Sequence, residues 1–313
     1  MSVLTIRSER STVFRLSWPI YALVLCALAA VLYAPMGEHL LDTHDADYFS
    51  DSEESLRNPS YFFSAEKRMP GRPFFELLLL LQYATWGNDP CLFHWAGVVL
   101  HAVAAWVLAL STWRACREWD GAQLAGVLFI CLCAPFQAVQ WISAHCYSLT
   151  LICSCLYLTS FVQYVDEGKR GPALRALLFL MLGIASHIST AVIVPFSLYI
   201  AYKKRALRRE ILSFLSVMAT VSFLSVLAIK TFYSVAPQNV IAARGFDFGM
   251  MAENYLFFWG RLLFSSFWIP ARPDLIGWGE MAFGAGALCM GLWTGFCGRW
   301  KGEAAIIWIA LSL

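Results

Sequence analysis

Acidic side chains gather in one short part of this chain, between residues 42 and 54. Six carboxylates lie there: Asp42, Asp45, Asp47, Asp51, Glu53 and Glu54. If this segment is extended, alternate side chains point the same way, so Asp45 and Asp47 together could hold Mg²⁺ or Mn²⁺, with waters and a substrate phosphate completing the shell. One of the two could instead act as a general base that removes a proton from an attacking hydroxyl. The alternative interpretation is a solvated acidic loop.

A single arginine at a predicted helix start is the next candidate. Arg72 follows Pro70-Gly71 and precedes Pro73, a residue well suited to the first turn of a helix. A guanidinium placed there could pair with a phosphate, and the free N–H groups of the helix N-terminus would add donors. Arg72 could equally be an anchor that reaches from the membrane to its polar surface.

Histidines are the remaining residues with suitable chemistry. His94 and His101 are seven residues apart and share one helix face, but two imidazoles without a third ligand are weak evidence for a metal. A buried His101 is more often a hydrogen-bonded core residue than a ligand. His145 and His187 fall at predicted outer ends of membrane spans, where they could meet a phosphate or face lipid headgroups.

The rest of the chain is strongly apolar. Hydrophobic residues make up 59% and charged residues 14% of the 313 positions, and the mean hydropathy is +0.60. A soluble domain carries about 25% charged residues, so this composition predicts an integral membrane protein. A net charge of +2, with basic residues dispersed among short loops, excludes a nucleic-acid-binding surface. The ten cysteines fall mostly within apolar runs and are interpreted as core or lipid-facing residues.

Hydropathy predicts an all-α, polytopic bundle of about 8–9 spans. A spanning helix needs about 20 mostly apolar residues. The candidates are 17–35, 91–112, 121–139, 143–164, 211–229, 280–297 and a segment starting near 304. Residues 173–202 have basic clusters on both flanks, and the positive-inside rule therefore predicts a hairpin with His187 at its outer tip. No Asp, Glu, Lys or Arg lies near a predicted span centre, which argues against an ion-coupled transporter.

The same rule predicts the sidedness of the loops. The N-terminus faces the cytoplasm, and the apolar stretch 74–86 lies in or dips into the outer leaflet without spanning it. Two long outer loops result, 36–90 with the acidic segment and the Arg-Pro helix, and 230–279 with an interfacial helix. We expect one membrane domain over 1–313, in a bacterial inner membrane. The sequence stops inside an apolar run, which suggests either a truncated chain or a last span that is barely completed.

Three segments resemble the membrane-embedded C-type glycosyltransferases that use polyprenyl-phosphate sugars, in particular relatives of the protein O-mannosyltransferases. Their Arg-Pro helix with aromatic-His and Leu-His pairs is similar to residues 71–74, 93–95 and 100–102. Their Trp-Ile-Ser-Gly-Arg span opening is similar to residues 141–145, and their Ser-Lys-Glu hairpin to residues 185–195. The order of the motifs, over roughly residues 15–205, carries the resemblance.

The resemblance implies a transfer reaction on the outer face of the membrane. A polyprenyl-phosphate-linked sugar would be the donor, a lipid, glycan or protein the acceptor, and Asp45 or Asp47 the catalytic carboxylate. Arg72, His101, His145 and His187 would bind the lipid phosphate, with membrane lipids around the site. Mg²⁺ or Mn²⁺ is the expected cofactor, if any.

The hairpin tip departs from the family pattern. His187-Ile188 replaces Lys-Glu, and His145 replaces Arg. The departure leaves open a catalytically inactive scaffold or lipid-binding protein of the same architecture. A transporter is a third alternative, supported only by the number of spans.

Overall fold

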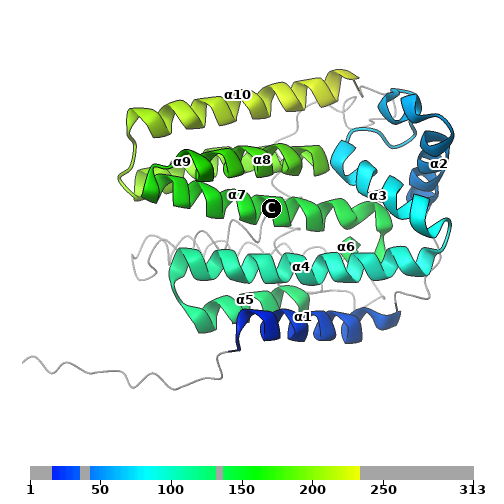
Figure 1. Cartoon of the computed structure of the whole chain (residues 1–313), viewed down its shortest axis with the longest axis horizontal. Helices are drawn as coiled ribbons and strands as arrows, with labels where there is room; N and C mark the ends of the chain where they lie inside the picture. Colours follow the sequence, from blue (N-terminus) through cyan, green and yellow to red (C-terminus); the bar gives the residue numbers. More distant parts are fainter. Residues whose placement is uncertain (1–15, 36–42, 132–136, 233–313) are drawn as a thin grey trace, which may run out of the picture.

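The structure is a computed structural model that describes residues 16–35, 43–131 and 137–232, and the described part of the chain is helical throughout. Six helices run lengthwise and side by side: α1 (Trp18–Tyr33), α4 (Pro90–Cys116), α5 (Trp119–Cys131), α7 (His145–Glu167), α8 (Arg170–Ser186) and α10 (Arg209–Phe232). A shorter helix, α9 (Ile193–Lys203), packs against α7 and α10 (Figure 1). The all-α prediction is confirmed.

Three of the helices are long and apolar enough to cross a membrane. They cover Pro90–Ala115, Ile142–Glu167 and Arg209–Ile229, and they correspond to the predicted spans 91–112, 143–164 and 211–229. Apolar helices of shorter length cover Trp18–Tyr33, Trp119–Cys131 and Ile188–Tyr202. Predicted span 121–139 is a helix only as far as Cys131, with the short α6 (Gln137–Gln140) after the undescribed residues 132–136. The predictions for 230–279, 280–297 and the segment from 304 lie outside the described residues, except for the end of α10.

Residues 170–203 form a helical hairpin, as the charge distribution predicts. Helix α8 ends at Ser186, His187 adopts an extended backbone conformation, and the 3₁₀ turn η5 (Ile188–Val192) leads into α9. The His187 side chain accepts a hydrogen bond from the Ser189 N–H, which caps η5. The break between the two helices therefore falls at the predicted hairpin tip.

Two large apolar cores hold the lengthwise helices together, and a smaller one lies between α4 and α7 around Val107, Leu108 and Cys155. One lies between α1, α4 and α5 and includes Tyr21, Leu25 and Ile130. The other lies between α7, α8, α9 and α10 and includes Tyr157, Phe161 and Leu180. Helix α7 packs against both α4 and α8, and it joins the two halves.

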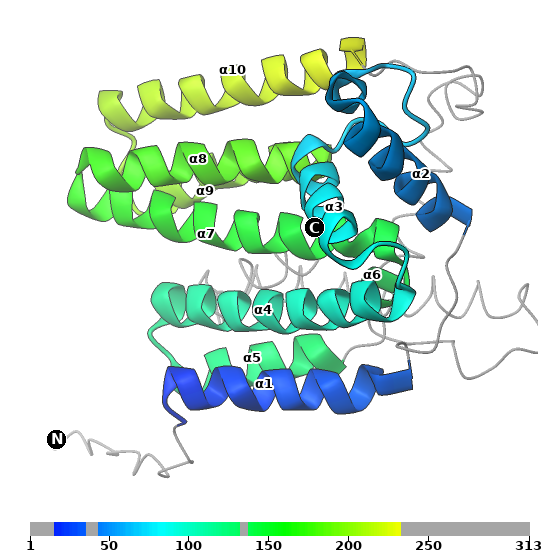
Figure 2. The ribbon, with the colours of Figure 1, turned by 45° about the vertical axis from the view of Figure 1, so that its right-hand side comes forward.

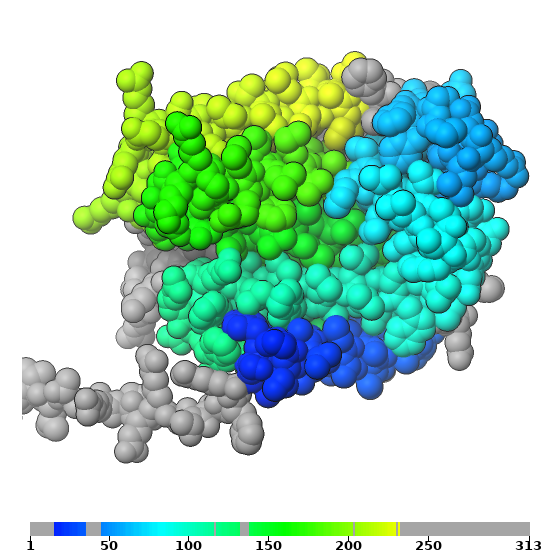
Figure 3. Space-filling view, viewed as in Figure 1, coloured from blue at the N-terminus to red at the C-terminus, as the bar shows by residue number. Residues whose placement is uncertain are grey.

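A separate helical cap covers one end of this bundle. It consists of α2 (Thr43–Arg57), the 3₁₀ turn η2 (Pro59–Phe63) and α3 (Pro73–Trp86). Figure 2 shows α2 and α3 lying across the end at which α7 begins and α8 ends, and the space-filling view in Figure 3 shows them covering that end. A further apolar core fixes the cap, with Tyr48, Phe49, Phe75, Phe93 and Ile142 among its residues. The sequence-predicted site residues of the first loop thus lie at the same end as the hairpin tip.

Candidate functional site

The site is built around the turn that opens α7. Residues 141–146, called here the 141–146 turn, include the 3₁₀ turn η4 (Ile142–Ala144). Asp45 of α2 accepts hydrogen bonds from two backbone N–H groups of this turn, that of Ser143 at 2.8 Å and that of Ile142 at 3.3 Å. Arg72 donates from Nη1 to the Ser143 carbonyl oxygen at 3.1 Å. The peptide groups of Ser143 therefore join an aspartate from α2 to the arginine at the start of α3.

Arg72 is a partly buried, fully charged group. It is the N-cap of α3, with Pro73 in the first helical position as predicted. Its Nη1 also contacts the Cys146 Sγ at 3.2 Å. Burial disfavours the charge on Arg72, but electrostatic attraction to its neighbours, above all Tyr48, outweighs burial and raises the pKa of the guanidinium. The site thus carries a permanent cation beside the positive end of the α3 dipole.

His187 faces the same cation from the hairpin tip. Its ring lies 5.0 Å from the ring of Tyr147, the residue that follows the 141–146 turn, and its Nδ1 is 2.8 Å from the Ser189 Oγ. Burial, and then the Arg72 charge, lower the pKa of His187 to about 4. The imidazole is consequently neutral at physiological pH and can donate or accept one hydrogen bond without adding charge.

Asp45 and Asp47 do not form the predicted pair. The segment is a helix rather than extended, so the expectation that both carboxylates point the same way is wrong: residues two apart on a helix face different directions. Asp45 is 1% exposed and points from α2 to the 141–146 turn, whereas Asp47 is half-buried and accepts from the Arg68 Nη1 at 3.3 Å. Within the described ranges no cluster of three or more His, Cys, Asp or Glu side chains could hold a metal ion. The two aspartates thus do not fit a shared Mg²⁺ or Mn²⁺ site.

The rings of the buried histidines of the bundle pack between helices. His101 packs between the rings of Tyr33 and Phe129 in the core of α1, α4 and α5. The His145 ring packs on Gly97, where even a methyl group would overlap it. His94 is likewise buried on α4. His101 and His145 therefore hold helices together, and of the three predicted histidine ligands His187 is the one whose ring is influenced by the Arg72 charge.

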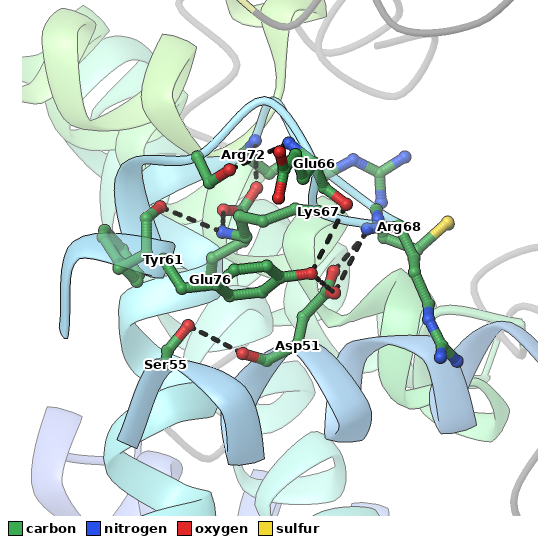
Figure 4. Close-up of polar contacts among 11 residues, drawn as sticks. Asp51, Ser55, Tyr61, Glu66, Lys67, Arg68, Arg72 and Glu76 are labelled. Atoms are coloured by element: carbon green, nitrogen blue, oxygen red, sulfur yellow. Dashed lines mark hydrogen bonds and ion pairs between the residues drawn. The ribbon is translucent and has the colours of Figure 1, made fainter. Parts of the chain in front are cut away.

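A polar network behind Arg72 was not predicted from the sequence. Figure 4 shows Asp51 of α2 accepting from the backbone N–H of Arg68 at 3.1 Å and from the Tyr61 hydroxyl at 3.1 Å, while the Met69 N–H donates to its other oxygen at 3.0 Å. Burial, and then the Asp51 carboxylate, raise the pKa of Tyr61 to about 12. Asp51 thereby fixes the loop that leads from η2 to Arg72.

Glu76 and Lys67 complete this network. Both side chains are buried, and they form an ion pair beside Arg72. One signal in the sequence could have found Glu76: it is the only acidic residue in the apolar stretch 74–86, and it lies one helical turn after Arg72. Nothing in the sequence singled out Lys67, whose position depends on how the loop folds back on α3.

No family model matches this chain, and no curated protein or solved structure matches it either. The geometry at the capped end of the bundle is therefore the basis for a functional proposal.

Proposed function

We propose that this protein is a multi-pass membrane glycosyltransferase that transfers a sugar from a polyprenyl-phosphate donor to a hydroxyl acceptor on the outer face of the membrane. The proposal includes the 8–9 spans, the cytoplasmic N-terminus and the bacterial inner membrane expected from the sequence. The acceptor would be a lipid, a glycan or a protein.

One observation carries the proposal: the Ser143 peptide groups join a carboxylate, Asp45, to a permanent cation, Arg72. Sugar transfer from a lipid phosphate requires a base for the acceptor hydroxyl and a positive group for the departing phosphate. The two groups sit at one end of an apolar bundle, where a lipid-linked donor can present its phosphate at the membrane surface. Neutral His187 beside Arg72 adds a hydrogen-bonding group without a second charge.

The reaction would proceed by displacement at the anomeric carbon. Asp45 takes the proton of the acceptor hydroxyl as its oxygen forms the new bond to that carbon. The bond from carbon to the phosphate oxygen breaks, and the electron pair stays on the polyprenyl phosphate, whose increased negative charge Arg72 and the N-terminus of α3 stabilise. No metal-dependent step is included, because Asp45 and Asp47 face different directions on α2.

A pair of matched variants tests the assignment of the base. Asn at position 45 can still accept from the Ser143 N–H, loses the longer bond from the Ile142 N–H, and cannot take a proton, so Asp45→Asn should lower transfer by about a hundredfold or more while the protein inserts and folds. Asp47→Asn loses a surface ion pair and should retain most activity. The measurement is sugar transfer from a radiolabelled polyprenyl-phosphate hexose in detergent. Equal and full activity in both variants would rule out the assignment.

A non-catalytic lipid-binding protein of the same architecture is the second candidate. Both oxygens of Asp45 accept hydrogen bonds from backbone N–H groups, so the carboxylate could serve only to hold the 141–146 turn in place, as an N-cap residue holds the start of a helix. Such a protein would bind polyprenyl phosphate at Arg72 and release it unchanged. Binding of the lipid by purified protein, with no transfer from any supplied donor, would favour this second candidate.

A further inference from the structure

Glu76 occupies an unusual place for a carboxylate. It lies in the first turn of α3 between Phe75 and the other apolar side chains of that helix, and it is 5% exposed. A buried charge is costly unless it is paired and hydrogen-bonded. The partners of the Glu76 carboxylate therefore indicate which groups this residue positions.

Its two oxygens have different partners, and both come from the loop before α3 (Figure 4). Oε1 accepts from the backbone N–H of Arg72 at 2.6 Å, and Oε2 accepts from the Lys67 Nζ. Lys67 is itself fixed, because its Nζ lies 4.6 Å from the centre of the Phe62 ring and 3.4 Å from the Phe62 carbonyl oxygen. One carboxylate thus ties both Lys67 and Arg72 to α3.

The backbone just before Arg72 needs such a restraint. Gly71 has a φ of 108°, a conformation open to glycine and rarely adopted by other residues, and glycine restricts the backbone less than any other residue. Asp51 holds the loop at Arg68 and Met69, upstream of this glycine. Glu76 is the side chain that holds the backbone downstream of it, at the residue whose guanidinium reaches the Ser143 carbonyl.

We propose that Glu76 is the positioning residue of the site, with Lys67 as its counter-ion, and that it sets the affinity for the phosphate of the lipid donor by fixing Arg72. This inference rests on the proposed function. Glu76 acts through Arg72 and touches neither donor nor acceptor, so its loss should weaken donor binding more than the chemical step.

Single substitutions would not isolate this role. Removing either partner leaves the other charge buried and unpaired, which destabilises the fold for reasons unrelated to Arg72. Two double variants avoid the problem, Lys67→Met with Glu76→Gln and Lys67→Met with Glu76→Leu. Both remove the ion pair and the contact of the lysine with Phe62. Only the Gln variant keeps an oxygen for the Arg72 N–H.

The comparison is the Michaelis constant for the polyprenyl-phosphate sugar in the two double variants. We expect the Leu variant to show a KM about five- to tenfold higher than the Gln variant, which is what a net hydrogen bond of about 1–1.4 kcal/mol is worth, with kcat changed less than twofold. Burying an amide is less favourable than burying Leu, so stability alone would favour the Leu variant. Equal KM values in the two variants would overturn the proposal.

A second readout separates this inference from the proposed function. Phenylglyoxal modifies accessible arginines, and mass spectrometry follows its reaction with Arg72 in the absence of any donor. Faster modification of Arg72 in the Leu variant than in the Gln variant is expected even if the wild-type protein transfers no sugar, in which case only the proposed function fails. Equal modification rates would contradict the positioning role itself.

Discussion

Ser143 connects the two residues on which the proposed chemistry depends. Its N–H donates to Asp45 and its carbonyl accepts from Arg72, so displacement of the 141–146 turn would disturb base and cation together. His187 approaches the same place from the hairpin tip and stays neutral because it is buried and close to Arg72. At the scale of single residues the site is therefore one cation, one carboxylate and one neutral imidazole.

The low pKa of His187 makes stability depend on pH in a definite direction. Between about pH 4, where the native imidazole titrates, and about pH 6.5, where an unfolded histidine titrates, the unfolded chain binds more protons. The contribution of neutral His187 to the free energy of unfolding is therefore fully present above about pH 6.5 and is lost as the pH falls toward 4. The His187→Asn variant keeps an acceptor for the Ser189 N–H. In thermal unfolding from pH 4 to 8, its melting temperature should fall less at acidic pH than that of the wild-type protein. An identical pH profile in the variant would contradict the pKa shift.

At the scale of elements, the sequence predicts where helices begin and end better than it predicts which of their side chains are buried. The Arg-Pro helix starts at Pro73 and the hairpin breaks at His187, because proline geometry and the basic flanks leave clear signals. The pairing of Asp45 with Asp47 depended on an extended acidic segment, whereas the segment is helix α2. Five of its buried positions follow helical spacing, Asp45, Tyr48, Phe49, Ser52 and Ser55, and Asp51 is buried beside them. Because Asp45, Ser52 and Ser55 on that buried face are polar, the hydropathy of the segment shows no helical period.

The site was predictable only in part, for a related reason. Arg72 and Asp45 could be chosen from the sequence because their residue types suit phosphate and proton chemistry. Their connection through Ser143, and the ion pair of Glu76 with Lys67, depend on loop contacts between residues nine to almost 100 positions apart. Hydropathy and local motifs contain no information on such pairings.

The contact between α4 and α7 gives a prediction at this scale. A methyl group at Gly97 would overlap the His145 ring, so Gly97→Ala should destabilise the protein by about 1–3 kcal/mol, the usual cost of overpacking. Gly121→Ala is the matched control, since its methyl group would meet only an ordinary contact with Glu118, and alanine favours helices. Melting temperatures measured by thermal unfolding in detergent distinguish the two variants. Equal melting temperatures for the two variants would show that α4 and α7 do not pack as described.

At the scale of the whole molecule, the helices separate two ends of different character. The cap, the 141–146 turn and the hairpin tip lie at one end, and the ion pair of Lys204 with Asp166 lies at the other (Figures 1 and 2). Helix α7 has 23 residues, which at 1.5 Å per residue separates the two ends by roughly 35 Å, enough to cross the hydrocarbon core. The proposed function requires the capped end to face outward.

Cysteine labelling tests that orientation. In a Cys91→Ser background, Glu66→Cys in the cap should react with a membrane-impermeant maleimide in intact cells, because Glu66 is exposed at the capped end. Lys169→Cys, between α7 and α8, should react only after the membrane is permeabilised. The reverse pattern would place the proposed site in the cytoplasm.

The most direct measurement is an experimental structure of the purified protein bound to a non-hydrolysable polyprenyl-phosphate sugar. Our proposal predicts the phosphate within hydrogen-bonding distance of the Arg72 guanidinium, close to His187, with the anomeric carbon facing Asp45. A phosphate bound elsewhere on the bundle, or a sugar out of reach of Asp45, would contradict the proposed glycosyl transfer.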